Sequence, residues 1–206
     1  MTSRWMVATN NEGKLLEFES FFEGKVVLES FKSFEKQSPA EPYETFLENA
    51  LEKARYASLV SKLPSIADDS GLVVDYLRGL PGVRSARFAD ISSEKKIQQD
   101  EANVRKLLSC MSSAKDLSQR CCRFVTTIVA IKSHDDPDPL ISRGVWEGLV
   151  AFEPRGKEGF GYDPIFYVSE KKRTAAQLSL SEKTVLSHRG KALKKISFEL
   201  FKKFKN

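Results

Sequence analysis

The residues with the clearest potential for chemistry are two adjacent acids in the segment Asp68-Asp69-Ser70-Gly71. A short apolar run precedes the segment and another follows it, so we expect the acids at a strand end, where a turn exposes them. Exposed carboxylates supply the oxygen ligands that hard cations prefer, and Mg²⁺ commonly combines one or two of them with substrate phosphates. The segment therefore predicts a magnesium site, with an acidic surface turn as the alternative interpretation.

Three more acids precede this segment and are candidates for the same site. Glu41 is available as a further metal ligand. Glu44 and Glu48 have the spacing of neighbours on a helix surface, and we expect them on a solvated face, partnered by Lys53 and Arg55.

A second polar cluster, residues 10–14, has the sequence Asn-Asn-Glu-Gly-Lys and lies where a strand is expected to pass into a helix. Backbone N–H groups at a helix N-terminus favour an anion, and Lys14 adds a positive charge. The cluster therefore favours phosphate binding, although a capped helix with a surface lysine is the alternative. It is not a P-loop, because the first glycine and the hydroxyl residue after the lysine are missing.

Two later segments have compositions suited to recognising a nucleotide. Residues 159–164, Gly-Phe-Gly-Tyr-Asp-Pro, combine two aromatic rings with flexible glycines and an acid, which suits stacking on a base. Residues 187–191, Ser-His-Arg-Gly-Lys, place a ring, a guanidinium and an ammonium at a helix start, suited to a purine carbonyl or a phosphate. The alternatives are a turn whose aromatics close the core and an ordinary helix cap.

Several common site types are excluded by spacing. Position 164 is proline and no helix pattern follows Gly159, which rules out a dinucleotide fingerprint. The two histidines, His134 and His188, are far apart and lie near no nucleophile motif, so no catalytic triad is indicated. Three cysteines without a CxxC pair predict neither a zinc site nor a disulfide framework.

The elements that must position these residues alternate between strands and long helices. Helices are expected over Lys14–Phe22, Thr45–Leu63, Ser93–Met111 and Ser187–Phe204. Their expected apolar contacts include Ile97, Val104, Leu107 and Leu108 in the third, and Leu193, Ile196, Leu200 and Phe204 in the last. Strands are expected over Trp5–Thr9, Val26–Ser30, Ser65–Asp68, Leu72–Leu77, Phe124–Ile131, Leu140–Phe152 and Ile165–Val168. Because two of the later strands read as a hairpin, the order favours an α/β fold with a mixed sheet, and residues 1–206 read as a single domain.

Charge is concentrated at one end of the sequence. The chain has 206 residues and a net charge of +5, and residues 191–206 contain six lysines against one glutamate. A charge run of this kind is usually a solvated helix face, so no nucleic-acid partner is expected. With no apolar leader or membrane-length segment, we expect a reduced, cytoplasmic protein that does not enter membranes.

Six segments in order resemble motifs of the inosine triphosphate pyrophosphatase family, whose members hydrolyse non-canonical purine nucleoside triphosphates to the monophosphate and pyrophosphate. They are ATNNEGK at 8–14, TFLENALEKA at 45–54, ADDSGL at 67–72, LPGVRSARFA at 80–89, GFGYDPIF at 159–166 and SHRGKAL at 187–193. The resemblance spans most of the chain and implies an elongated mixed sheet flanked by helices, with two lobes and an active-site cleft between them. It also implies a homodimer, and we expect exposed aromatics such as Phe88 or Trp146 to contribute to its interface.

The same resemblance implies roles for individual residues. Asp69 would accept the proton of the attacking water, and Glu41 and Asp69, with Asp68 as an auxiliary carboxylate, would support Mg²⁺. The residues implied to bind substrate are Thr9, Asn10, Asn11, Glu12, Gly13, Lys14, Lys53, Ser70, Phe160, Gly161, Tyr162, Asp163, Lys183, His188 and Arg189. Phe160 to Asp163 would form the base-recognition loop, and Arg189 or a backbone N–H would donate to the purine O6.

Three positions depart from the pattern of the family. Arg84 stands where an aromatic is common, Asp90 where glycine is usual and Gln177 where an acid is frequent. None of these removes a proposed catalytic group. They bear on loop conformation and substrate preference.

Two other functions fit the same residues. One is a pyrophosphatase for other modified or canonical nucleotides, which would use the same acids with a different base loop. The other is a nucleotide- or nucleic-acid-binding protein without turnover, whose binding would depend on residues 191–206 and weaken steeply with salt. The acids near Asp69 argue against this binder, because they repel a polyanion in the absence of a metal.

Overall fold

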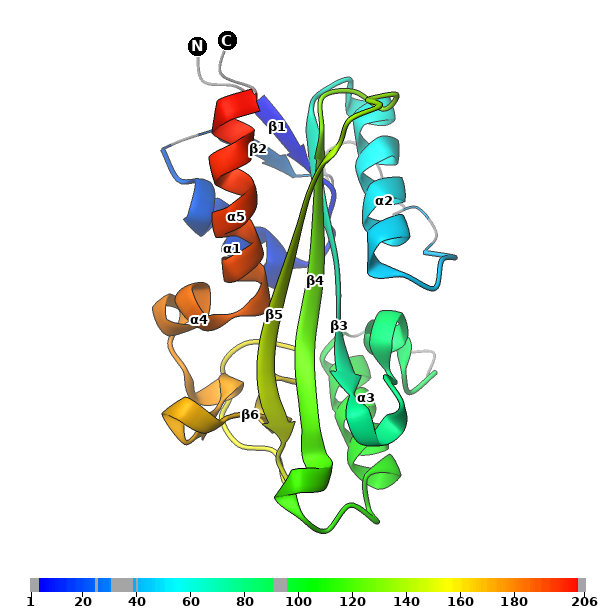
Figure 1. Ribbon diagram of the computed structural model, residues 1–206, viewed down its shortest axis with the longest axis vertical. Coiled ribbons are helices and arrows are strands. Elements are labelled where there is room, and N and C mark those ends of the chain that lie inside the picture. The colour runs from blue at the N-terminus through cyan, green and yellow to red at the C-terminus, as the bar shows by residue number, and fades with distance from the viewer. Residues whose placement is uncertain (1–3, 25, 31–38, 40, 91–95, 204–206) are drawn as a thin grey trace. The chain divides into compact units, whose positions relative to one another are not determined.

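The computed structural model of the protein describes residues 4–24, 26–30, 39, 41–90 and 96–203. Seven strands form one sheet in the order β2-β1-β3-β4-β5-β6-β7. β1 pairs parallel with β2 and β3, whereas β6 pairs antiparallel with β5 and β7, so the sheet is mixed (Figure 1). The strands are β1 (Arg4–Val7), β2 (Val27–Ser30), β3 (Ser65–Val74), β4 (Cys121–Ile131), β5 (Leu140–Val150), β6 (Phe166–Val168) and β7 (Arg173–Thr174). The predicted α/β fold with a mixed sheet and flanking helices is confirmed.

The helices are α1 (Glu12–Phe22), α2 (Phe46–Ser61), α3 (Lys96–Cys110), α4 (Leu180–Leu186) and α5 (His188–Lys203). The chain forms two units. Unit 1 comprises the described residues of Met1–Asp69, Thr126–Gly144 and His188–Asn206, and unit 2 comprises those of Ser70–Val125 and Val145–Ser187. Strands β3, β4 and β5 each contribute residues to both units.

Unit 1 has helices on both faces of its strands (Figure 1). On one face, Phe18 and Phe22 of α1 and residues of α5 pack with Ile66 of β3. On the other face, the alanines of α2 pack with Ala67 of the same strand. Because successive strand residues point to opposite faces, β3 is buried on both sides here.

The helix predicted for residues 45–63 is confirmed with well-defined ends. Thr45 is the N-cap of α2, and its hydroxyl accepts a hydrogen bond from the Glu48 amide at 3.2 Å. Ala50, Ala54 and Ala57 lie on one stripe and are fully buried. Small side chains on that stripe allow the helix to approach the sheet closely.

Residues 65–74 differ from expectation, because they form one continuous strand instead of two strands around a turn. Gly71 marks a close approach: a Cβ there would lie 2.1 Å from the Gly82 carbonyl oxygen and 2.6 Å from Ser85 Oγ. The Leu72 amide also donates to Ser85 Oγ at 2.9 Å. Asp68 and Asp69 are therefore buried inside a strand, and the prediction of an exposed turn at a strand end was wrong.

Unit 2 has a separate core with an aromatic centre. The ring centroids of Phe124 and Phe166 are 4.5 Å apart, and those of Trp146 and Phe166 are 4.9 Å apart. Trp146 is only 3% exposed, so the prediction that it is an exposed aromatic was wrong. Phe88 is half-buried against this core, with the Lys106 ammonium 4.8 Å from its ring centroid.

The helices differ from the sequence-based expectations in a few places. In α3, Val104, Leu107 and Leu108 face the core as expected, but Ile97 is 74% exposed. Helix α4 was not anticipated; it begins at a capping box in which Ser179 and Glu182 bond reciprocally. In α5, Leu193, Ile196 and Leu200 are buried as predicted. Residues 93–95 and Phe204 lie outside the described residues.

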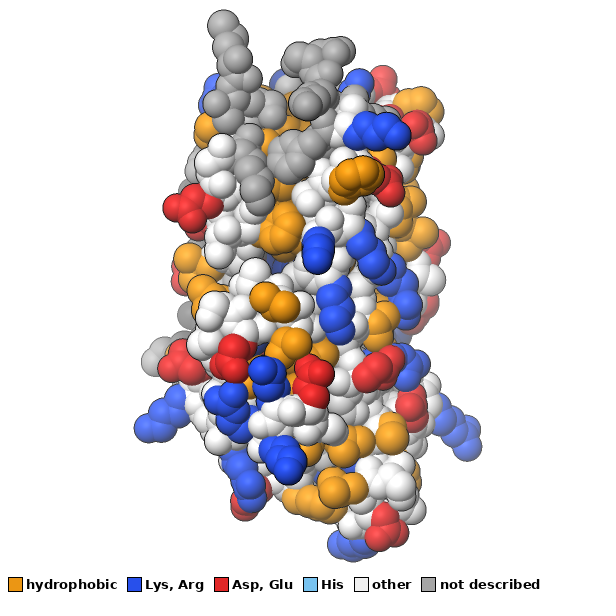
Figure 2. All heavy atoms as spheres, turned by 60° about the vertical axis from the view of Figure 1, so that its left-hand side comes forward, with side chains coloured by type: hydrophobic (Ala, Val, Ile, Leu, Met, Phe, Trp, Pro, Cys, Tyr) orange, Lys and Arg blue, Asp and Glu red, His pale blue; other side chains and the backbone are white. Residues whose placement is uncertain are grey.

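Four lysines of the last helix have exposed side chains. Lys191, Lys194, Lys195 and Lys202 are exposed. In the view of Figure 2, lysine and arginine side chains are interspersed with acidic and apolar ones. No helix among the described residues combines the length and apolar composition needed to cross a membrane.

The three cysteines are free and differ in exposure, which gives a first prediction. Cys110 and Cys121 are exposed, whereas Cys122 is buried, and burial raises the pKa of its thiol. Because the thiolate is the reactive form, we expect two cysteines to react quickly with a thiol reagent in the native protein and three after unfolding. In the control Cys110→Ser the fast count should fall to one. Three fast thiols in the native protein would contradict the burial of Cys122.

Candidate active site

The site in unit 1 is organised by the alternation of side chains along β3. Ile66 and Asp68 face α1 and α5, whereas Ala67 and Asp69 face α2. The two adjacent acids therefore have different partners. Each is almost fully buried, with 2% exposure for Asp68 and 5% for Asp69.

Asp69 is held by two side chains of α2. Lys53 Nζ donates to Asp69 Oδ1 at 3.0 Å, and Asn49 Nδ2 donates to Asp69 Oδ2 at 3.3 Å. Asn49 and Lys53 are four residues apart, so they lie on the same helix face. Lys53 Nζ also donates to Glu41 Oε1 at 2.9 Å, so both carboxylates converge on one ammonium. The prediction that Lys53 lies on a solvated face with Glu44 and Glu48 was wrong, because Lys53 is buried.

The electrostatics around Asp69 suit a proton acceptor. Burial raises the pKa of Asp69 above its ordinary value, against the opposing effect of the Lys53 and Lys14 charges. Burial alone would lower the pKa of Lys53, but the attraction of Asp69 and Glu41 outweighs it and keeps the ammonium charged. A carboxylate with a raised pKa is a stronger base than an ordinary one.

The pair Glu41 and Asp69 fits the ligand chemistry of a magnesium ion. Their oxygens already face one cationic centre, the Lys53 ammonium. Two carboxylates together with phosphate oxygens form a donor set typical of Mg²⁺. Among the residues that the structure describes, no three acidic, histidine or cysteine side chains form a metal-binding group. Asp68, the third predicted carboxylate, instead binds cationic side chains.

Asp68 is the centre of a buried charge network. Its Oδ2 accepts hydrogen bonds from Arg189 Nε at 3.2 Å and from Arg189 Nη2 at 3.0 Å, and forms an ion pair with Lys14 Nζ at 3.0 Å. Thr126 Oγ1 lies 3.4 Å from the same oxygen. Arg189 Nη1 donates to Glu17 of α1, so the guanidinium, only 2% exposed, bridges two carboxylates. The pKa of Arg189 is raised because Asp68 and Glu17 outweigh the effect of burial.

The predicted phosphate segment forms the start of α1. Asn11 is the N-cap, and its Oδ1 accepts hydrogen bonds from the amides of Gly13 at 3.0 Å and Lys14 at 3.4 Å. Thr9 Oγ1 accepts from the Asn11 amide at 3.2 Å, and Asn10 and Glu12 are exposed. Burial lowers the pKa of Lys14, while Asp68 opposes that shift.

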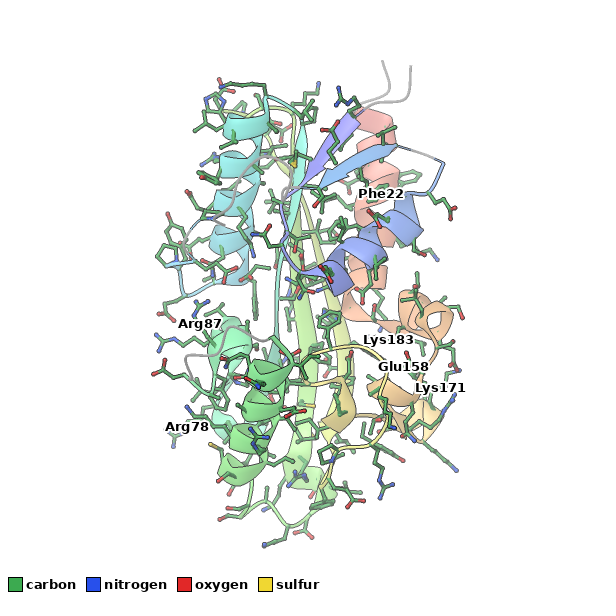
Figure 3. All side chains as sticks on the ribbon, turned by 180° about the vertical axis from the view of Figure 1, so that it is seen from behind. Phe22, Arg78, Arg87, Glu158, Lys171 and Lys183 are labelled. Carbon is green, nitrogen blue, oxygen red and sulfur yellow. The ribbon has the colours of Figure 1, made fainter. Side chains whose placement is uncertain are left out.

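The predicted base-recognition loop belongs to unit 2, where hydrogen bonds to the Asp163 carboxylate hold it in place. Asp163 Oδ2 accepts from the Phe160 amide at 2.9 Å and from Lys183 Nζ at 2.7 Å. A Cβ on Gly159, whose φ is +81°, would lie 2.1 Å from the same oxygen. Lys183, labelled with Glu158 in Figure 3, also lies over the Phe160 ring, 5.3 Å from its centroid.

The other residues that were predicted to bind substrate are buried or half-buried. The ring of Tyr162 is buried in the core of unit 2, and its hydroxyl donates to the Ser85 carbonyl oxygen at 2.9 Å. Ser70 is half-buried in β3, and His188 is buried at the start of α5.

Some partners of the predicted residues were not identified from the sequence, among them Glu17, Asn49, Thr126 and Asp100, which accepts a hydrogen bond from the Gly161 amide. Asn49 carried a usable signal, because it is a polar residue four positions before Lys53 and next to the apolar stripe of α2. Glu17, Asp100 and Thr126 had none, because the residues to which they bond are at least 57 positions away in the sequence, as in the 172-residue separation of Glu17 and Arg189.

Two of the three departures from the family pattern have a visible structural consequence. Asp90 adopts a φ of +47°, in the left-handed region that favours glycine and that Asp tolerates better than most residues. The side-chain oxygen of Gln177 accepts from the Thr174 amide at 3.0 Å in a capping box. Arg84 is exposed in the 3₁₀ segment Gly82–Arg87.

Comparison with known proteins identifies the family to which the chain belongs. The model of the Ham1 family matches residues 5–198. A dITP/XTP pyrophosphatase from Vibrio cholerae is 45% identical over 194 residues, covering 93% of each chain, and one from Escherichia coli K12 is 43% identical over 192 residues, covering 92% of this chain and 93% of that protein. A HAM1 protein from Coxiella burnetii superimposes with a TM-score of 0.86 at 40% identity, covering 98% of this chain and 100% of that one. The resemblance noted in the sequence is thus confirmed, and the chain belongs to the Ham1 family.

Proposed function

We propose that the protein hydrolyses non-canonical purine nucleoside triphosphates, namely ITP, dITP and XTP, to the nucleoside monophosphate and pyrophosphate. The observation that carries the proposal is the convergence of Glu41 and Asp69 on Lys53, within a chain that covers more than nine-tenths of relatives named dITP/XTP pyrophosphatase. This activity would remove abnormal nucleotides from the nucleotide pool.

The first step of the proposed reaction is charge neutralisation. A triphosphate repels an attacking water until cations offset the charge on its phosphoryl oxygens. Lys53, which is buried, and Lys14, whose side chain is 16% exposed, are the cations of unit 1 that serve this purpose, and each is held by a carboxylate that fixes its ammonium. Mg²⁺, held by Glu41 and Asp69, would supply further positive charge at the phosphoryl oxygens.

The second step is deprotonation of the attacking water. We assign this role to Asp69, because the lysine and asparagine bonds fix both of its oxygens and burial raises its pKa. The water would attack so that the bond between the α and β phosphates breaks. Asn49 acts as a positioning residue, because it bonds to the oxygen that Lys53 does not.

We assign recognition of the base to the loop of residues 159–163, in which Phe160 is the aromatic residue that is not buried in the core. Hypoxanthine and xanthine carry a carbonyl at carbon 6, where adenine has an amino group. A hydrogen-bond donor placed there would be left unpaired by adenine, at a cost of about 1–3 kcal/mol per donor. Guanine shares the carbonyl, so its 2-amino group must be rejected separately.

We also propose a homodimer in the cytoplasm. The free cysteines are compatible with a reducing compartment. Large apolar side chains such as Val185 of α4 and Phe198 of α5 are about three-quarters exposed, at 74% and 75%, and could be covered by a second copy. Sedimentation at several protein concentrations would measure the oligomeric state.

Product analysis tests the proposed reaction. We expect dITP and XTP, incubated with the protein and Mg²⁺, to yield pyrophosphate and the monophosphate, with much slower turnover of dATP and dGTP. Removing Mg²⁺ with a chelator should abolish the activity. Release of orthophosphate instead of pyrophosphate would refute the proposal, and equal rates for all four nucleotides would support the alternative of a pyrophosphatase that does not select the base.

A further inference from the structure

Asp100 of α3 makes a contact with the base-recognition loop that neither the sequence motifs nor the proposed mechanism uses. Its Oδ2 accepts a hydrogen bond from the Gly161 amide at 2.9 Å. The two residues are 61 positions apart, so only the fold brings them together. Asp100 is half-buried, and its charge adds to the effect of burial in raising the pKa of the neighbouring Tyr162 hydroxyl.

This bond completes the fixation of one peptide group in the loop. The amide of Gly161 donates to Asp100, and the carbonyl oxygen of the same peptide, Phe160 O, accepts from the Asp163 amide at 3.3 Å. The next amide toward the N-terminus, that of Phe160, donates to Asp163. Two consecutive amides are therefore bound to two different carboxylates.

Without the bond to Asp100, the N–H of this peptide group would lose its hydrogen-bond acceptor. Gly161 has a φ of +62°, it carries no side chain, and a Cβ built there would meet no atom within 4 Å, so the space beside its Cα is open. Glycine populates both signs of φ about equally, which makes rotation of the preceding peptide group inexpensive. Rotation would redirect the Gly161 N–H and the Phe160 carbonyl, the two polar groups that this peptide presents.

We propose that Asp100 is a positioning residue for base discrimination: by holding the Gly161 amide it fixes the Phe160–Gly161 peptide in one orientation. The inference rests on the proposed function. Discrimination between purines depends on leaving a donor or acceptor unpaired by the wrong base, which requires that the loop cannot rotate to satisfy it. A loop with a free peptide group would adapt to dATP or dGTP as well as to dITP. Asp100 therefore acts on selectivity more than on the chemical step.

The test compares Asp100→Ala with Asp100→Asn and with the control Glu101→Ala. Glu101 is the next residue of α3, and its carboxylate is exposed in a surface pair with Arg105 at 3.6 Å, so this control removes the same charge from the same helix. Alanine removes the acceptor for the Gly161 amide. Asparagine keeps a carbonyl oxygen that can accept the same bond, although without the charge.

For Asp100→Ala we expect the ratio of kcat/KM for dITP to that for dATP to fall about tenfold, the size expected for losing one hydrogen bond to a charged group. The change should appear mainly in KM, with the KM for dITP rising relative to that for dATP and kcat for dITP within about threefold of wild type. Asp100→Asn should restore most of the selectivity, and Glu101→Ala should keep all of it. Faster hydrogen exchange of the Gly161 amide in both Asp100 variants, followed by NMR, would report the weakened bond directly.

Each outcome is decisive. If the wild type releases no pyrophosphate from dITP, the proposed function fails and this inference falls with it. If the wild type is selective but Asp100→Ala keeps the same dITP to dATP ratio, only the role of Asp100 is overturned. An equal loss of kcat for every nucleotide without rescue by asparagine would also overturn it, because that pattern indicates general damage. If Asp100→Ala does not fold, Asp100→Asn decides: a Gly161 amide that exchanges faster while the dITP to dATP ratio keeps its wild-type value would overturn the proposal.

Discussion

Asp69→Asn is expected to reduce the release of pyrophosphate from dITP at least a hundredfold while leaving the fold intact. General-base catalysis contributes about 10²–10⁴-fold to a rate, and an amide cannot accept the proton. The replacement has nearly the same shape, and Lys53 keeps its bond to Glu41, so the buried ammonium retains one carboxylate. The variant should also need more Mg²⁺ for its residual activity, because one of the two proposed ligands is lost.

The measurement is steady-state pyrophosphate release across a Mg²⁺ titration, with circular dichroism to confirm folding. Asp75→Asn is the matched control, since it makes the same substitution at an acid that follows β3. The Asp75 side chain is 57% exposed and pairs with Arg123 at the surface, so this control should behave like the wild type. Near-normal turnover of Asp69→Asn, with unchanged magnesium dependence, would remove Asp69 from the catalytic role.

Arg189→Met is expected to lower the free energy of unfolding by about 3 kcal/mol or more. Removing one partner of a buried ion pair leaves an uncompensated charge, which typically costs about 3–5 kcal/mol. The side chains of Asp68 and Glu17 are 1% and 10% exposed, so solvent cannot replace the guanidinium around them. Lys14 remains 3.0 Å from Asp68 and offsets part of the loss there.

Urea unfolding of three variants would check this expectation. Lys194→Met, on an exposed residue of the same helix, should change the stability by less than about 0.5 kcal/mol. The double variant Glu17→Gln with Arg189→Met should be more stable than Arg189→Met alone, because it also removes the buried negative charge to which Arg189 had bonded. A double variant less stable than the single one would show that charge compensation is not what Arg189 provides.

The sequence by itself determined the fold class, the location of most elements and the family. Helix α2 could be predicted because Thr45 caps it and three alanines repeat at helical spacing, and both signals act within a few residues. The motif of Asp68 and Asp69 was informative for the same reason, since its chemistry depends on residue type and adjacency.

Only the tertiary structure decided how these residues are used. The two acids read as an exposed turn, yet they lie within one continuous strand, whose residues 66–69 are covered by α1 and α5 on one face and by α2 on the other. Their opposite orientations, one toward Lys53 and the other toward Arg189, follow from the alternation of a strand that is covered by helices on both faces. Contacts such as Glu17 with Arg189 and Asp100 with Gly161 join residues that are 172 and 61 positions apart. A local pattern contains no information about such partners, because the chain must fold before they meet.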